Sequence, residues 1–187
     1  MKVQIAVLSG ERARRIVPLG VAALAVLALG TAWYAESVLG LVPCALCLLE
    51  RWPYRAAITF GVLAAVLPRG PATVARALLV LTLLAGAGLG LAHLGVEQHW
   101  WPDPLPECMA PTFHGGSLAA RLAAMPAHPA KPCDEPTYLI PGLPLSMAAM
   151  DMLLNLGFAA LVAISSWTRA TRAVCGAGRG HKTTLSI

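Results

Sequence analysis

The chain has 187 residues, of which 57% are hydrophobic and 12% are charged. A soluble domain carries about twice that share of charged residues, so this composition excludes an ordinary soluble globular protein. The formal net charge of +5 comes from basic residues that flank long apolar blocks. It therefore indicates membrane topology and gives no reason to expect nucleic acid binding.

Three apolar blocks are long enough to cross a bilayer. They cover residues 16–35, residues 77–96 and residues 143–167, and the second block is interrupted only by His93. Crossing about 30 Å of hydrocarbon requires about 20 helical residues at a rise of about 1.5 Å per residue. We therefore predict one transmembrane helix for each block.

A fourth block is less regular, because only residues 56–67 are free of charge and these twelve residues are too few to span. An upstream extension gives enough length at the cost of including Glu50, Arg51 and Arg55. We predict a fourth helix over 44–67 on this basis, with the Arg55 side chain reaching toward the interface.

The positive charges predict the orientation of these helices. Ten of the fourteen basic residues lie before the first helix, between the second and third, or after the fourth: Lys2, Arg12, Arg14, Arg15, Arg69, Arg76, Arg169, Arg172, Arg179 and Lys182. Because cytoplasmic loops are rich in lysine and arginine, both termini are expected in the cytoplasm. A cleaved signal peptide is the rival interpretation of the N-terminus, but its apolar stretch is long and no small-residue cleavage site follows it.

The expected fold class is an all-α membrane protein in which residues 1–187 form a single integral membrane domain. Four transmembrane helices form a bundle, and a long periplasmic loop over about 97–142 joins helices 3 and 4. The many prolines of this loop predict mostly irregular structure. One short helix, residues 118–125, is expected within it, capped by Ser117.

The five cysteines separate according to this topology. Cys44 and Cys47 open the second helix on the outer face, whereas Cys108 and Cys133 both lie in the outer loop. Cys175 alone falls in the cytoplasmic tail. Two pairs of thiols thus face an oxidising compartment, and the unpaired one lies where thiols stay reduced.

The first cysteine pair has the features of a redox site. A disulfide between Cys44 and Cys47 would close a very small ring and restrain little chain, so stabilisation is a weak reason for it. A helix N-terminus and the nearby Arg51 both favour the reactive thiolate. An arginine at mid-membrane costs about 2.5–3.5 kcal/mol, which indicates a task such as stabilising that thiolate or hydrogen-bonding a quinone oxygen. The alternative is an arginine that reaches the interface and pairs with Glu50.

The sequence Pro43-Cys44-Ala45-Leu46-Cys47-Leu48-Leu49-Glu50-Arg51 resembles the motif of the disulfide-bond formation protein B (DsbB) family. The resemblance extends to the four helices, the second cysteine pair in a long outer loop, and Gly142-Leu143 at the start of the last helix. It covers nearly the whole chain. One departure concerns the segment between the last loop cysteine and Gly142-Leu143, in which members of the family often have one or two aromatic residues. Here the residues from Asp134 to Pro141 include only one, Tyr138.

This resemblance implies a protein-dithiol:quinone oxidoreductase of the bacterial inner membrane, with both cysteine pairs on the periplasmic side. A reduced periplasmic DsbA-like thiol oxidase would attack the Cys108–Cys133 disulfide through Cys108, and Cys133 would then pair with Cys44. Cys47, beside Arg51, would pass the electrons to ubiquinone or menaquinone. Disulfide bond formation in periplasmic proteins is the expected outcome.

Polar residues within the other helices are further candidates. His93 is a candidate for the quinone pocket, although a hydrogen-bonded histidine at the interface is the more ordinary explanation. Asp151 and Asn155 lie one turn apart in the fourth helix, and a carboxylate inside a membrane suggests function unless it is a hydrated group near the helix end.

Two other classes of protein compete with this interpretation. A metal-binding membrane protein would use zinc-type ligands, with one site from Cys108, His114, His128 and Cys133 and a second from Cys44 and Cys47. The spacing matches no compact zinc module, and we expect no metal. A structural four-helix membrane protein with inert disulfides is the other alternative, and redox lability of the cysteines distinguishes it.

Overall fold

The computed structural model describes residues 2–105, 117–119, 131–140 and 142–180. These residues form helices and connecting segments and contain no strand. The long elements are α1 (Lys2–Ser37), α3 (Arg51–Val66), α4 (Arg69–Glu97) and α6 (Met147–Gly180), and the short α2 (Ala45–Leu49) precedes α3. The all-helical fold class is thereby confirmed for the part of the chain that is described.

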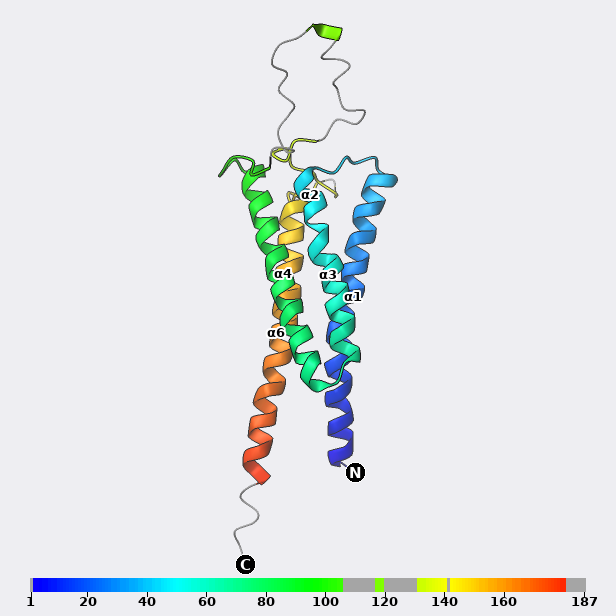
Figure 1. The fold of residues 1–187 in the computed structure, drawn as a ribbon, viewed down its shortest axis with the longest axis vertical. Coiled ribbons are helices and arrows are strands. Elements are labelled where there is room, and N and C mark those ends of the chain that lie inside the picture. The colour runs from blue at the N-terminus through cyan, green and yellow to red at the C-terminus, as the bar shows by residue number, and fades with distance from the viewer. Residues whose placement is uncertain (1, 106–116, 120–130, 141, 181–187) are drawn as a thin grey trace, which may run out of the picture.

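The four long helices lie side by side in an elongated bundle (Figure 1). α1 packs against α3, α3 against α4, and α4 against α6. The beginning of α1 and the end of α6 lie at the same end of the bundle, and α2 lies at the other end (Figure 1). This arrangement brings the first cysteine pair to the end of the bundle at which α4 ends and α6 begins.

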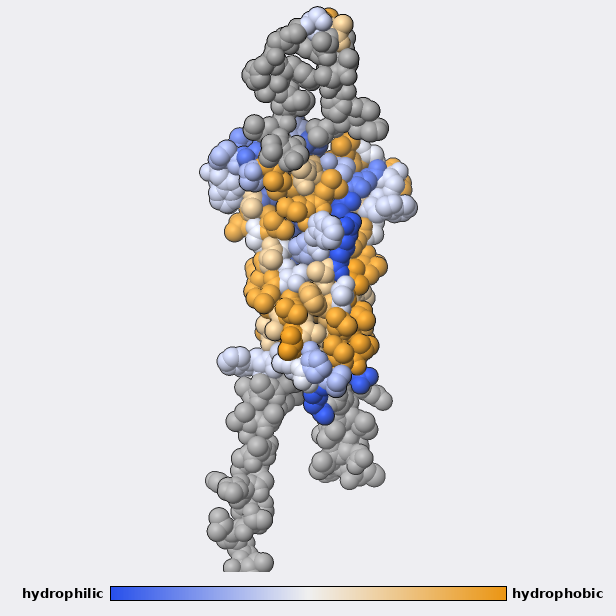
Figure 2. Space-filling view, in the orientation of Figure 1, coloured by the Kyte–Doolittle hydropathy of each residue, from blue (hydrophilic) through white to orange (hydrophobic). Residues whose placement is uncertain are grey.

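Three helices are long and apolar enough to cross a membrane. The candidate spans are Arg14–Ser37, Arg69–Glu97 and Met147–Trp167. Their outward side chains are largely leucine, valine and isoleucine, which gives the middle of the bundle the apolar belt of Figure 2. Because lipid tails are as apolar as leucine, such residues remain stable on the outside of a membrane bundle.

The helix boundaries differ from those expected at two places. Arg69 and Arg76, expected in a loop, belong to the first turns of α4, which follows Pro68 directly. The last helix begins at Met147 and not at residue 143, because the Ser146 hydroxyl accepts a hydrogen bond from the Ala149 amide (3.2 Å) and so caps it.

The expected continuous helix over 44–67 is interrupted at Glu50, between α2 and α3. Pro53 explains the break, because it has no N–H and its ring clashes with the carbonyl of the residue four places earlier, Leu49. Leu49 is the last residue of α2. The remaining α3 has 16 residues, fewer than a straight crossing needs. The fourth transmembrane crossing therefore stays a prediction.

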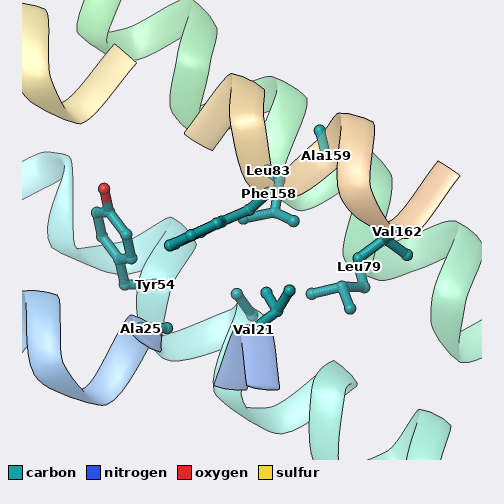
Figure 3. Close-up of a cluster of buried hydrophobic side chains, with 9 residues drawn as sticks. Val21, Ala25, Tyr54, Leu79, Leu83, Phe158, Ala159 and Val162 are labelled. Carbon is teal, nitrogen blue, oxygen red and sulfur yellow. The ribbon is translucent and has the colours of Figure 1, made fainter. Parts of the chain in front are cut away.

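The middle of the bundle is closed by an apolar cluster to which all four long helices contribute (Figure 3). Its members are Val21, Ala25, Tyr54, Ala57, Leu79, Leu83, Phe158, Ala159 and Val162. Small residues among them allow close helix approach, which drives association in membranes. Above this cluster, toward α2, the interior becomes polar.

Candidate functional site

Cys44 and Cys47 meet at the start of α2. Cys44 occupies the N-cap position, and its Sγ accepts a hydrogen bond from the Cys47 backbone amide at 3.2 Å. The two Sγ atoms are 2.8 Å apart, and both cysteines are free thiols. A helix N-terminus that donates to Sγ stabilises negative charge on the sulfur. The pair therefore has the proximity and the activation that reversible disulfide formation requires.

The two thiols face different neighbours. Cys44 is buried in a cluster with Leu46, Val96 and Cys133, and Cys133 is disulfide-bonded. Cys47 is partly exposed and lines a cavity between helices. One cysteine of the first pair thus lies against Cys133, whereas the other lines a cavity.

A buried histidine and a buried glutamate lie behind Cys44. His93 Nε2 of α4 is 3.5 Å from Cys44 Sγ, and His93 Nδ1 is 2.8 Å from Glu50 Oε1. A carboxylate that accepts from Nδ1–H fixes the ring orientation and leaves Nε2 facing the sulfur. Of the two explanations that the sequence allows for His93, the contacts favour a hydrogen-bonded histidine. His93 is not among the residues that line the cavity next to Cys47.

Arg51 pairs with Glu36 of α1. Its Nη1 donates to Glu36 Oε2 at 3.2 Å, and Nη2 forms an ion pair with Oε1 of the same carboxylate. The alternative in which Arg51 pairs with Glu50 is wrong, because Glu50 contacts His93 instead. The Arg51 Nε atom is buried without a hydrogen-bond partner, and the Arg51 side chain lines a cavity.

The cavity that Cys47 lines has a volume of about 210 Å³. Its walls come from α1, α2, α3, α6 and the segment around Thr137 and Leu139, and they are mainly apolar. The charged and redox-active groups among them are Glu36, Cys47, Glu50, Arg51 and Asp151. An apolar cavity with a few polar groups, open to a thiol and a guanidinium donor, fits a flat hydrophobic ring with carbonyl oxygens.

The remaining predicted residues are placed as follows. Cys108, His114 and His128 lie outside the described residues, as do residues 120–125 of the predicted loop helix. Cys175 is in α6. Asp151 and Asn155 are both buried within the span of α6. The Cys108–Cys133 pairing therefore stays a prediction.

An acidic surface adjoins Cys133. Asp103 and Asp134 line a shallow pocket with Trp100 and Trp101. Partial burial, together with the neighbouring Asp134 carboxylate, raises the pKa of Asp103. The two tryptophans stack edge to face, with ring centroids 5.8 Å apart. Aromatic residues of this kind are typical of the membrane–water interface.

The sequence missed the roles of Glu50 and Glu36. The sequence indicates both as acidic residues next to apolar helices. It does not indicate that Glu50 contacts His93 or that Glu36 contacts Arg51. The contacts join residues 43 and 15 positions apart, which no local pattern encodes. Tyr54, two turns beyond Cys47, was also not singled out.

The chain is similar to known proteins over most of its length. A family model described as disulfide bond formation protein DsbB matches residues 14–165. An uncharacterized protein of Rickettsia prowazekii is 29% identical over 134 residues, 71% of this chain and 76% of that protein. Disulfide bond formation protein B 1 of Pseudomonas fluorescens strain Pf-5 is 38% identical over 86 residues, 46% of this chain and 50% of that protein.

The same-named protein of Pseudomonas fluorescens strain Pf0-1 is 37% identical over 86 residues, 46% of this chain and 50% of that protein. The chain thus spans about half the length of the two Pseudomonas relatives. No solved structure matches it.

Proposed function

This chain belongs to the DsbB family of disulfide bond formation proteins, and from that premise we propose that it is a membrane thiol:quinone oxidoreductase. It reoxidises a periplasmic DsbA-like dithiol oxidase and passes the electrons to ubiquinone or menaquinone. The observation that carries this proposal is the position of the first cysteine pair. Cys44 packs against Cys133, and Cys47 lines the apolar cavity.

The first half of the reaction is disulfide exchange at the loop. The partner's dithiol attacks the proposed Cys108–Cys133 disulfide through Cys108 and becomes oxidised, and the loop pair becomes a dithiol. Cys133 then attacks a Cys44–Cys47 disulfide at Cys44. The burial of Cys133 against Cys44 supports this step, because exchange requires direct approach of the sulfurs.

The second half restores the Cys44–Cys47 disulfide. Two S–H bonds are broken and one S–S bond forms, which releases two electrons and two protons. His93 Nε2 lies where it can accept the Cys44 proton, and Glu50 stabilises the resulting imidazolium through Nδ1. Because Glu50 also lines the cavity, it connects this proton to the acceptor site.

The cavity residues fit a quinone. Cys47 and the Arg51 guanidinium would hold one carbonyl end, and the apolar walls from α1 and α6 would hold the ring. A bound quinone supplies a two-electron, two-proton acceptor. An external acceptor is needed because a DsbA-type oxidase has a reduction potential of about −120 mV, and an ordinary disulfide is too weak an oxidant to regenerate it. The DsbA–DsbB–quinone route is the periplasmic example of such an acceptor.

The proposed location is the bacterial inner membrane with both termini in the cytoplasm. The clusters of lysine and arginine at the ends of the helices support this orientation. Both cysteine pairs would then face the periplasm, where thiols are oxidised.

The proposal is tested by quinone reduction with the purified full-length protein in detergent, supplied with a reduced DsbA-like partner. We expect turnover in the wild type, loss of turnover in Cys47→Ser, and retention in the matched control Cys175→Ser. Cys108→Ser should also stop turnover driven by the partner, because it blocks entry of the electrons, but its reduced Cys44–Cys47 pair should still reduce quinone in a single turnover. Quinone reduction that survives in Cys47→Ser contradicts the assignment.

A second candidate function, metal binding, is favoured by one specific observation. The ligand atoms of Cys44, Cys47 and His93 all lie within 4.8 Å of one another, and Glu50 holds His93 as a carboxylate holds a zinc-ligating histidine. Zinc measured in protein purified under reducing conditions tests it. One zinc ion per chain that His93→Ala abolishes, together with absent quinone turnover, would favour this function.

A further inference from the structure

A polar cluster not used by the disulfide chemistry lies inside α6. Asp151 and Asn155 retain only 9% and 0% of their exposure, although both lie within the candidate membrane span. Asn155 Nδ2 is 3.1 Å from the Tyr54 hydroxyl oxygen, 3.0 Å from the Asp151 carbonyl and 3.2 Å from Asp151 Oδ1. Asp151 Oδ2 and Asn155 Oδ1 have no hydrogen-bond partner.

The neighbouring helix is shaped to admit this cluster. A Cβ atom at Gly86 of α4 would lie 2.6 Å from Asn155 Oδ1, and one at Gly90 would lie 3.0 Å from Asp151 Oδ2. At Gly90 the atom nearest to that Cβ is the Met152 backbone nitrogen, at 2.8 Å, so the glycines admit the α6 backbone as well as the polar side chains. Polar groups buried in a membrane without full pairing are costly. Their presence here, beside the cavity, points to a task beyond packing.

Asp151 belongs to the same cavity as the reactive thiol. Tyr54, Asp151 and Cys47 all line it. Arg51 and Tyr54 are one turn of α3 apart, which is a rise of about 5 Å. The cavity therefore has one polar end at Cys47 and Arg51 and a second at Tyr54 and Asp151, with apolar walls around them.

We propose that Asp151 is a proton donor for quinone reduction, acting at the end of the cavity opposite Cys47 and Arg51. This inference rests on the proposed function. Asn155 Nδ2 lies 3.2 Å from Asp151 Oδ1, and the protonated carboxyl group, which lines the cavity with Tyr54, gives its proton to the acceptor. The two thiols release two electrons and two protons. The Cys44 proton reaches the acceptor through Glu50, and the Cys47 proton replaces the one that Asp151 gives up, so the quinol gains two protons and Asp151 is protonated again.

The surroundings of Asp151 suit a carboxylic acid. Among the described residues that line the cavity, Arg51 is the only basic one, and its charge is paired with Glu36. The other carboxyl group there, Glu50, is bonded to His93 of α4. No cation is thus committed to Asp151 within this site, and a neutral acid is the form that a low-dielectric interior tolerates best. Glu50 relays the Cys44 proton, and Asp151 supplies the second one.

The test compares Asp151→Asn, which preserves shape and removes the acidic proton, with Asp151→Glu, which retains it. The matched control is Glu97→Gln, because Glu97 is also a buried carboxylate with an unpartnered oxygen but does not line the cavity. We expect Asp151→Asn to lower kcat by about 10²-fold, a typical loss for an acid–base group, with an unchanged quinone KM. Asp151→Glu should recover part of the rate, and Glu97→Gln should remain within twofold of the wild type.

A second readout does not depend on turnover. The infrared spectrum of the quinone-free protein should contain a carboxylic acid C=O band that shifts in D₂O and is missing in Asp151→Asn. Absence of this band in the wild type, or equal rates in Asp151→Asn and Asp151→Glu, overturns the proton-donor role. Wild-type turnover that Asp151→Asn retains also overturns it and leaves the proposed function standing. No quinone turnover in the wild type refutes the proposed function and this inference together.

Discussion

The two halves of the bundle are held together by different interactions. Toward the termini, the interior consists of apolar and small side chains such as Val21, Leu79 and Val162. Toward α2, the interior contains the thiol pair, His93–Glu50 and Arg51–Glu36. Tyr54 lies at the boundary, since its ring belongs to the apolar cluster and its hydroxyl contacts Asn155.

This difference separates stability from reactivity. The apolar half has well-packed side chains whose removal leaves a cavity. The polar half includes buried groups without partners, which lower stability and are retained at sites with chemical roles. We therefore expect substitutions in the first half to change unfolding and those in the second to change turnover.

The largest expected effect on stability is that of Leu79→Ala, since Leu79 is fully buried between the helices. Deleting such a side chain costs about 2–5 kcal/mol of unfolding free energy. Leu81→Ala is the matched control on the same helix, because Leu81 is 61% exposed and lipid replaces its contacts. Thermal unfolding in detergent measures both, and equal losses would contradict the assignment of the core.

His93→Gln is expected to have the next largest effect, now on reactivity. Loss of the imidazole removes the group that accepts the Cys44 proton, and reoxidation of the Cys44–Cys47 dithiol should slow by about 10²-fold. Single-turnover reoxidation of the reduced protein by quinone measures the rate. His99→Gln is the control, since His99 lies just beyond α4 and its Nδ1 atom contacts the Glu97 carbonyl (3.2 Å) instead of a thiol. Thermal stability close to that of the wild type would show that the effect is chemical.

The smallest expected effect is that of Arg51→Lys. Lysine retains the charge but loses both the bidentate contact with Glu36 and the Nε donor. We expect the quinone KM to rise about tenfold, which corresponds to about 1.4 kcal/mol of binding free energy. Arg55→Lys is the control, because Arg55 contacts the Trp52 ring (5.1 Å) and does not line the cavity. Equal changes in the two variants would show that Arg51 has no specific contact with the quinone.

Much of the candidate site followed from local sequence. The Cys44–Cys47 spacing at a helix start and the nearby Arg51 were sufficient to predict a redox pair, because adjacent turns of one segment determine which side chains meet. The helix break at Glu50 differs from the continuous helix predicted over 44–67. Its local signal is Pro53, which cannot donate an amide hydrogen bond to Leu49, and the apolar length of the segment does not reveal it.

The sequence by itself determined the apolar helices, the close spacing of Cys44 and Cys47, and the family. Hydropathy and motif spacing are properties of contiguous residues, so they can be read without knowledge of packing. Only the tertiary structure decided that Glu50 bonds to His93, that Glu36 pairs with Arg51, and that Asp151 shares a cavity with Cys47. The packing of equally apolar helices depends on how small residues such as Gly86 and Gly90 of α4 fit against α6. Hydropathy does not encode that fit.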